Sequence, residues 1–379
     1  MVHDNRYVWL DFIRGISAII VCGGHLRAAM FIDYSQLETT SIFKQLFYFI
    51  TGLGHQSVLV FFVLSGFFVG GSVINSRHRF KFIDYLIARL SRLWVVLIPA
   101  LIFTSFIDLY IINSFSSPFT AEHDSILASG TSTNYSISVD TLLGNIIFLQ
   151  GIYFPVFGSN GPLWSLTNEF WYYMFFPLIA ICIGYVHSAK IYRVLCAFTL
   201  VLLAIFIAQS ILEGFIIWLM GVVVFCIYKK PFSCNYFFVF IAGALFSLSL
   251  VDSKVAIIHA NIPLSSDLLV AITFSLFIVS IKGINAPKKV YKLIAEISKW
   301  LSEISYSLYL SHFPIVMLIY VNFYAEKQLI LGFNGLIQYT FWLSILFLLA
   351  VIFWLVFERN TSKVRSWMTK LQLKVVTRL

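Results

Sequence analysis

The stretch WLDFIRGISAIIVCGGHLRAAMFI, Trp9–Ile32, decides how the rest of the chain is interpreted. It is long and apolar enough to cross a bilayer as a helix, yet it contains Asp11, Arg14 and His25. Ionisable side chains inside a membrane helix are costly and mark a candidate functional site. With about 100° and 1.5 Å per residue, Arg14 and His25 point within about 20° of each other and lie about 16 Å apart along the axis. We therefore expect them to share one helix face.

Asp11 precedes Arg14 by three residues, a helical spacing at which the two side chains can form an ion pair. One interpretation of the segment is structural: an arginine whose charged end reaches the interface, and a histidine that packs against a neighbouring helix. The other is a polar helix face that takes part in chemistry within the bilayer. The segment alone favours neither.

The composition of the whole chain indicates a membrane protein with many spans. Of its 379 residues, 60% are hydrophobic and 11% are charged, and the mean hydropathy is +0.89. Soluble domains carry about 25% charged residues. The first apolar run contains charges and is followed by many others, so we interpret it as a span and not as a cleaved signal peptide. The net charge of +9 is spread over short loops, a pattern that argues against nucleic-acid binding and follows the positive-inside rule.

The apolar runs predict an all-α, polytopic bundle of about ten transmembrane helices. With the N-terminus inside, 21 of the 26 Lys and Arg residues fall on the cytoplasmic side. This asymmetry predicts that both termini are cytoplasmic. The residues left outside are Lys44, Lys254 and Lys327, with Arg27 at the outer end of the first span. The predicted spans are 9–31, 54–75, 93–112, 164–184, 194–210, 214–228, 235–251, 265–281, 303–323 and 336–357.

Leu142–Phe157 is apolar but is interrupted by polar residues, by glycine and by proline. If it crossed the membrane, every later loop would be reversed and the positive charges would lie outside. We therefore expect a re-entrant or interfacial segment, buried against the bundle where irregular backbone is tolerated. Residues 113–163 would then form the largest outer region. The chain divides into a transmembrane domain, 1–358, and a basic cytoplasmic tail, 359–379, and we expect no appended soluble domain.

Polar residues also occur at defined places in the next two apolar runs. Ser65 and Gly66 lie in a Phe-rich run, where small residues permit close helix packing or the approach of a ligand to the backbone. Arg89 and Arg92 are three residues apart and share a face as the chain enters the third span. Arginines at such a position set topology or contact lipid headgroups. A guanidinium group also binds phosphate through two parallel hydrogen bonds, which makes the pair a candidate phosphate site.

Two carboxylates occur near the ends of later spans. Glu169 lies less than two turns into a helix, between Trp164 and Trp171. It belongs either to an interfacial aromatic belt or to a site in which an acid orients a substrate hydroxyl or the histidine. Glu358 and Arg359 are adjacent at the end of the last span, and we expect a local ion pair between them.

The late segment ISYSLYLSHFP carries the last group of candidates. Ser305, Tyr309 and His312 follow a 4+3 spacing that puts them on one helix face, whereas Tyr306 and His312 do not share a face. The five cysteines form no CxxC pair, and no HxxE motif, Asp cluster or Cys/His set indicates a metal. We expect neither a metal nor a permanently bound cofactor.

These segments, in this order, resemble the acyltransferase-3 family of integral-membrane O-acyltransferases. The resemblance runs from about Trp9 to Glu358, and five motifs in one order are more specific than any one of them. It implies transfer of an acetyl group from cytoplasmic acetyl-CoA to a hydroxyl of an outward-facing glycan, such as an O-antigen or exopolysaccharide, at the inner membrane of a bacterium. The motifs are the Arg14–His25 helix, the FFVLSGF run, the Arg89–Arg92 segment, the Trp164–Glu169 helix and the Ser305–His312 segment.

Acyl transfer to a sugar needs a base of near-neutral pKa, for which histidine is the usual residue. His25 is therefore the expected catalytic base. No cysteine or serine lies in an obvious base-assisted arrangement, so we favour direct attack of the hydroxyl on the thioester over a covalent acyl-enzyme. The remaining expected site residues are Arg14 and Glu169 as further catalytic residues, Arg14, Arg89, Arg92, Ser65 and Gly66 for donor binding, and Asp11, Trp164, Tyr306, Tyr309 and His312 as other candidates.

Two other classes of function compete with an enzyme. A proton-coupled transporter or flippase also uses intramembrane Arg, His and Glu. Such proteins often contain internal repeats, and the sequence shows none. The third class is a non-catalytic partner in glycan assembly. The expected partners are acetyl-CoA, a lipid-linked or exported glycan acceptor and membrane lipids.

Overall fold

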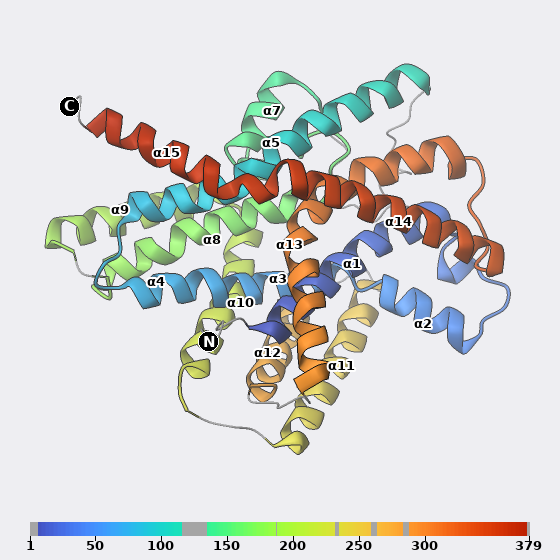
Figure 1. Cartoon of the computed structure of the whole chain (residues 1–379), viewed down its shortest axis with the longest axis horizontal. Helices are drawn as coiled ribbons and strands as arrows, with labels where there is room; N and C mark the ends of the chain where they lie inside the picture. The colour runs from blue at the N-terminus through green and yellow to red at the C-terminus, as the bar shows by residue number, and fades with distance from the viewer. Residues whose placement is uncertain are drawn as a thin grey trace.

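The computed structural model describes residues 7–115, 135–186, 188–231, 235–258, 264–282 and 288–376 (Figure 1). Within these ranges the protein is a bundle of helices, and the only β-type pairings are isolated bridges. The predicted all-α class is therefore confirmed. The helices that form the bundle are α1 (Val8–Met30), α2 (Ile42–Thr51), α3 (Gly54–Ser65), α4 (Gly71–Ser76), α5 (Phe82–Ser114), α7 (Val139–Ile146), α8 (Leu163–Cys182), α9 (Lys190–Phe206), α10 (Gln209–Tyr228), α11 (Tyr236–Ile258), α12 (Leu264–Ser280), α13 (Lys288–Ile319), α14 (Phe333–Val356) and α15 (Thr361–Val376).

Each of the ten predicted spans coincides with a helix of the structure. Among the described residues, seven helices are long and apolar enough to cross a membrane. The other three predicted spans correspond to α8, α9 and α12. The number of about ten crossings therefore stays a prediction, whereas the helical character of every predicted span is confirmed.

Among the described helices, α1 and α13 form the most extensive pair (Figure 1). Glycines let neighbouring backbones approach α1 closely. A Cβ added at Gly15 would overlap the Leu301 side chain, and one added at Gly24 would overlap the carbonyl oxygen of Thr51. Small residues of this kind permit tight packing between membrane helices. The polar residues of α1 are therefore held against α13 in a fixed position.

A second close contact lies between α3 and α10. The helix continues from α3 through a π-helical turn, Gly66–Gly70, into α4. A Cβ added at Gly66 would overlap the carbonyl oxygen of Trp218, and one added at Gly221 would overlap that of Val63. The packing interpretation of Gly66 is thus confirmed. Single π-helical turns often occur at functional sites.

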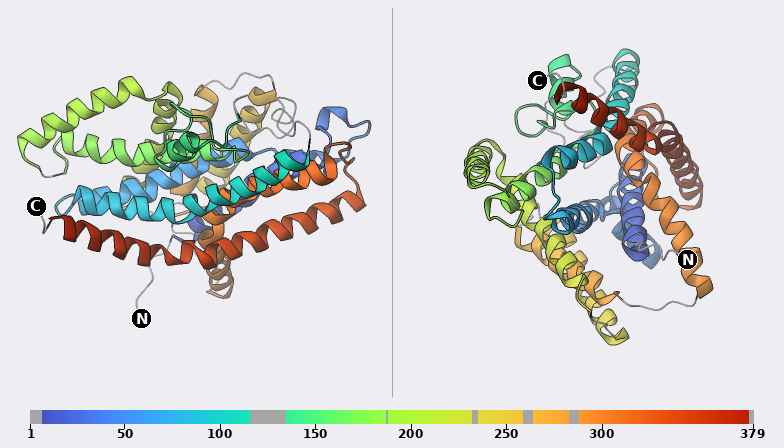
Figure 2. Two further views of the ribbon diagram at one scale, coloured as in Figure 1. Left: turned by 90° about the horizontal axis from the view of Figure 1, so that it is seen from above. Right: turned by 60° about the vertical axis from the view of Figure 1, so that its left-hand side comes forward.

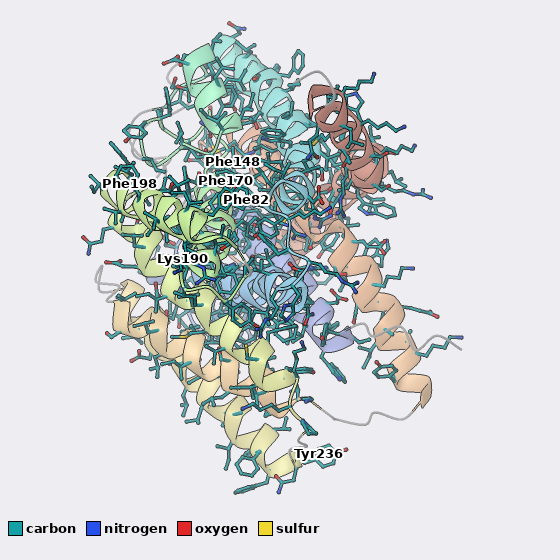
Figure 3. The ribbon with its side chains drawn as sticks, turned by 90° about the vertical axis from the view of Figure 1, so that its left-hand side faces the viewer. Phe82, Phe148, Phe170, Lys190, Phe198 and Tyr236 are labelled. Atoms are coloured by element: carbon teal, nitrogen blue, oxygen red, sulfur yellow. The ribbon has the colours of Figure 1, made fainter. Side chains whose placement is uncertain are left out.

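The segment 142–157 contains the end of α7 and an irregular loop, and no long helix. The eight residues of α7 extend only about 12 Å, so this part of the chain is too short to cross as a helix. One buried amide satisfies part of the loop backbone, since Asn145 donates to the Thr141 and Pro155 carbonyls and accepts from the Phe157 N–H. Phe148 stacks on Phe170 of α8 with ring centroids 4.2 Å apart (Figure 3). One side of the segment therefore packs against the bundle, while Leu143, Ile147 and Tyr153 are exposed. Its re-entrant or interfacial place in the membrane stays a prediction.

The loop that follows is tied to α5 and α13. The buried Asp108 carboxylate accepts hydrogen bonds from the Ser159 N–H (2.7 Å), the Ser159 hydroxyl (2.6 Å) and the Tyr135 hydroxyl (3.0 Å). Burial and the nearby Asp108 charge raise the pKa of the Tyr135 phenol, so it stays protonated as a donor. Asn160 donates to the Thr104 hydroxyl and to the Leu310 carbonyl. Much of the predicted outer region, 113–163, is thus anchored; its residues 116–134 lie outside the described residues.

The basic turns gather at one end of the bundle. The Arg77 guanidinium lies 4.8 Å from the centre of the Tyr185 ring, Lys229 donates to Asn75, and Lys282 donates to the Tyr228 carbonyl. The C-terminal end of α15 lies at the same end as the start of α5 (Figure 2). These basic turns, the start of α5 and the end of α15 are among the segments that the charge pattern assigns to the cytoplasm. Exposed aromatic residues such as Phe198 and Tyr236 lie on the periphery, where a lipid-facing surface is expected (Figure 3).

Candidate functional site

A cavity of about 210 Å³ lies among α1, α3, α5, α8 and α13, and we call it the arginine cavity. Its wall combines three arginines with one carboxylate and with hydroxyl groups. Four of the five residues expected to bind a donor line it, and Gly66 lies beside it next to Ser65. The polar residues of the wall are Arg14, Ser65, Arg89, Arg92, Ser165, Glu169, Tyr173, Ser305, Tyr306 and Tyr309.

Glu169 is held on the wall of the arginine cavity by two hydroxyl groups. Its Oε1 accepts hydrogen bonds from the Ser65 hydroxyl (3.0 Å) and from the Tyr173 hydroxyl. The Trp218 indole N–H in turn donates to the Ser65 oxygen (3.1 Å). These contacts put Glu169 in the cavity and not against His25. Any action of Glu169 on a substrate would therefore take place in the arginine cavity.

All three cavity arginines lie against aromatic rings, and Arg92 lies 5.4 Å from the centre of the Tyr306 ring. Arg14 pairs with Asp11 at 3.0 Å, as its spacing predicted, and its guanidinium lies 5.7 Å from the centre of the Phe68 ring. Arg89 lies 5.6 Å from the centre of Tyr85 and 6.0 Å from that of Tyr173. A guanidinium that stacks on an aromatic face keeps its N–H edges available for an anion. The wall therefore presents positive charge to the cavity.

The predicted ion pair between Glu358 and Arg359 is wrong, because Glu358 pairs with Arg92. Arg92 Nη1 lies 2.7 Å from Glu358 Oε1, so the glutamate pairs with α5 instead of with its neighbour Arg359. Adjacent residues of a helical turn do not face each other, and Arg359 lies over the Trp354 ring instead. Glu358 is buried and also accepts hydrogen bonds from the N–H (3.1 Å) and hydroxyl (2.6 Å) of Ser307. The end of the last span is thus part of the cavity's surroundings.

The other end of the α1–α13 contact holds two histidines. His25 Nδ1 lies 2.9 Å from His312 Nε2, and His312 Nδ1 lies 2.9 Å from the Leu308 carbonyl oxygen. The two rings stack, with centroids 5.2 Å apart and planes 11° apart, and Phe313 packs edge-on against His25. His312 is fully buried, whereas His25 is half-buried. We call these two residues the histidine pair.

Arg14 and His25 both contact α13, as the shared helix face predicted. Arg14 donates to the Ser302 carbonyl (3.4 Å), and His25 contacts His312 ten residues further along α13. The sequence did not indicate which helix would cover this face. The structure thus assigns α1 and α13 jointly to both ends of the candidate site.

Tyr309 lies between the arginine cavity and the histidine pair. It lines the cavity, its hydroxyl lies 2.7 Å from the Ser165 hydroxyl, and its ring centroid lies 6.1 Å from that of His312. Tyr306 also lines the cavity and donates to the Leu93 carbonyl (3.0 Å). The late motif therefore contributes to both parts of the site, since its tyrosines line the cavity and its histidine lies one turn beyond.

Trp164 does not line the arginine cavity. It faces a second cavity of about 260 Å³, whose lining includes Asn168 and a close pair formed by His55 and Asp267, 2.8 Å apart.

The sequence did not indicate that Tyr173 and Trp218 belong to the site, because aromatic residues in a Phe-rich span look the same whether they face lipid or a site. The one available signal was that Tyr173 follows Glu169 by four residues. No group of three or more His, Cys, Asp or Glu side chains in the described parts of the chain is arranged to bind a metal.

Comparisons with known proteins identify the family of the chain. A family model described as an acyltransferase domain matches residues 7–359. An O-acetyl transferase of Shigella phage Sf6 is 27% identical over 159 residues, which is 42% of this chain and 41% of that protein. An uncharacterized protein of Haemophilus influenzae is 29% identical over 163 residues, 41% of this chain and 60% of that protein. The matched regions thus cover about two fifths and three fifths of these relatives, and no solved structure matches. Because the family model covers nearly all of it, the chain belongs to the acyltransferase-3 family.

Proposed function

We propose that this protein is a membrane O-acyltransferase that moves an acetyl group from acetyl-CoA to a hydroxyl group of a glycan. The observation that carries the proposal is the arginine cavity, which approaches the histidine pair across a single tyrosine. Anion binding and proton acceptance are the two functions that a CoA-dependent acyl transfer requires. The phage relative, which is described as an O-acetyl transferase, supports the choice of acyl group and acceptor atom.

The arginine cavity is the proposed donor site. The phosphate groups of acetyl-CoA are anions, and Arg14, Arg89 and Arg92 can bind them through charge-assisted hydrogen bonds. The aromatic and apolar part of the lining would accept the uncharged arm that carries the thioester. Tyr309 marks the direction of the histidine pair, so the thioester would lie at that side of the cavity.

His25 is the proposed general base. The hydroxyl oxygen of the acceptor attacks the thioester carbonyl carbon while its proton moves to His25. The carbon–sulfur bond then breaks, and the CoA thiolate leaves and takes up the proton held by His25. The products are the acetyl ester and free CoA, and the enzyme returns to its starting state. No covalent acyl-enzyme is needed in this sequence.

We also propose that the protein lies in the inner membrane of a bacterium with both termini in the cytoplasm, so that the basic end faces the CoA pool. A single cysteine at an exposed position on each side tests this orientation in a cysteine-free background. Ser35→Cys in the first outer loop should react with an impermeant maleimide in intact cells, and Ser362→Cys at the start of α15 should react only after lysis. The reverse pattern would contradict the proposed orientation.

The activity itself can be tested with purified protein in lipid nanodiscs. We expect transfer of radiolabel from acetyl-CoA to an acceptor glycan, or slow release of free CoA when the acceptor is water. Proton-coupled flux of a solute in vesicles, with no CoA released under any condition, would contradict the enzyme and support the transporter. A matched sample with Arg89→Ala, which keeps the histidine pair, should lose most of the signal at low donor concentration.

A further inference from the structure

The hydrogen bonds of the histidine pair determine where its protons lie. A backbone carbonyl oxygen can only accept a hydrogen bond. His312 Nδ1, 2.9 Å from the Leu308 carbonyl oxygen, must therefore carry a proton and donate it. Because His312 is fully buried in the membrane bundle, a neutral ring is the favourable state. In a neutral ring with a proton on Nδ1, Nε2 carries the lone pair.

The second hydrogen bond follows from the first. His312 Nε2, now an acceptor, lies 2.9 Å from His25 Nδ1. Two acceptors at this distance would repel each other, so His25 Nδ1 must be the donor and must carry the proton. The protonation of one ring nitrogen is set by the hydrogen bond that the other makes. For neutral His25, the remaining nitrogen, Nε2, is then the atom with the free lone pair.

We propose that His312 is a positioning residue that fixes the tautomer of His25 so that Nε2 is the proton-accepting atom. This inference rests on the proposed function, in which His25 accepts the proton of the acceptor hydroxyl. The stacking of the two rings and the edge-on contact with Phe313 hold the ring plane of His25 in one orientation. His312 itself touches neither the donor nor the acceptor in this arrangement.

The arrangement also suits the charged state of His25. When Nε2 takes a proton, the imidazolium still donates from Nδ1 to the same acceptor, so the hydrogen bond strengthens and no group has to turn. In serine hydrolases a carboxylate plays the corresponding part. Here the acceptor is a neutral imidazole whose own proton goes to a backbone carbonyl. The pair therefore orients a base without burying an additional permanent charge within the membrane.

Nitrogen NMR of histidine-labelled protein in nanodiscs tests the tautomer directly, with the His25 signals assigned from their loss in His25→Asn. We expect a protonated Nδ1 and an unprotonated Nε2 in the wild-type protein. In His312→Leu the acceptor is gone, and we expect His25 to shift toward the Nε2-protonated form that free histidine prefers. A wild-type His25 protonated on Nε2 would overturn the inference. These signals report the tautomer whether or not acyl transfer occurs, so this failure is distinguishable from failure of the proposed function.

Steady-state kinetics test the consequence for turnover. We expect kcat of His312→Leu to fall by about 10- to 100-fold, by analogy with the cost of removing a partner that orients a metal-bound histidine. The KM for acetyl-CoA should not change, because the arginine cavity is left intact. His312→Gln, whose amide oxygen can accept from His25, should recover part of the lost kcat. Ser311→Ala, at a buried neighbour whose hydroxyl donates to the Ser307 carbonyl, is the matched control for damage to α13. Equal kcat values in His312→Leu and Ser311→Ala would overturn the positioning role.

Discussion

The two ends of the contact between α1 and α13 differ in charge and in access. At one end, Arg14 keeps 30% of its side chain exposed and faces a cavity with two more arginines. At the other end, His312 is completely buried and its hydrogen-bond partners are neutral. Three arginines thus line the end where an anionic donor would arrive. At the other end the histidine pair relies on hydrogen bonds between neutral groups, and the nearby Arg27 is paired with Asp33. The difference suggests that binding and proton transfer are separated along one helix pair.

The largest expected effect comes from removing the base and leaving the arginine cavity intact. His25→Ala should lower turnover by about 10²–10⁴-fold, the usual contribution of a general base. CoA affinity, measured by calorimetry, should not change, because no cavity arginine contacts His25. A folded His25→Ala protein with turnover within a few-fold of wild type would contradict the separation of the two ends.

The second prediction concerns the arginines. Arg89→Ala should weaken CoA binding by about 10- to 100-fold, because hydrogen bonds to charged groups contribute about 1.5–3 kcal/mol each. Arg92→Lys should weaken it less but measurably, since a point charge replaces a two-pronged donor. The turnover of donor-saturated enzyme should change little in both variants. If Arg89→Ala and Arg92→Ala both bind CoA with unchanged affinity, the arginine cavity is not the donor site.

The third prediction perturbs the wall of the arginine cavity through packing. Gly66→Ala forces a methyl group against the Trp218 carbonyl, and overpacking of this kind costs about 1–3 kcal/mol. It should lower the unfolding temperature and disturb the bond from Trp218 to Ser65. Gly54→Ala, where an added Cβ meets nothing within 4 Å, is the control and should leave the unfolding temperature nearly unchanged. Equal unfolding temperatures in the two variants would show that the contact with α10 is loose.

The smallest expected effect is the coupling between Arg92 and Glu358. A double-mutant cycle with Arg92→Gln and Glu358→Gln should give a coupling free energy of unfolding of about 0.5–1 kcal/mol, because Arg92 is 40% exposed and its charge is partly solvated. A parallel cycle with Arg359→Gln should give a coupling near zero. A larger coupling for Arg359 would restore the local pair that the sequence suggested.

Much of the fold was predictable because apolar runs and charge asymmetry act locally. The ten predicted spans all coincide with helices, and the Asp11–Arg14 pair follows from spacing alone. The irregular segment 142–157 could be recognised from its polar residues, and because a crossing there would place the later positive charges outside. The number of crossings was not fixed this way, because α9 and α12 have only 17 residues each.

The candidate site was predictable residue by residue but not as an arrangement. Arg14, Arg89 and Arg92 were each chosen for their own position, and the structure brings them into one cavity. The contact between His25 and His312 joins residues 287 positions apart, and no local spacing encodes such a pair. Trp164 shows the opposite case, since its motif neighbour Glu169 faces a different cavity. Helix rotation, which decides these faces, depends on tertiary packing and not on local sequence.

The bonds of Asn160 have a consequence for how the protein is made. This amide joins the loop before α8 to Thr104 and to the Leu310 carbonyl, 150 residues further along the chain. During synthesis from the N-terminus, the second bond cannot form until α13 has been made and inserted. The loop, and with it the start of α8 that carries Glu169, therefore reaches its final position only late in assembly. A nascent chain that ends before α13 would lack His312, this anchor and the α13 wall of the arginine cavity, so both parts of the candidate site can form only after α13 is inserted.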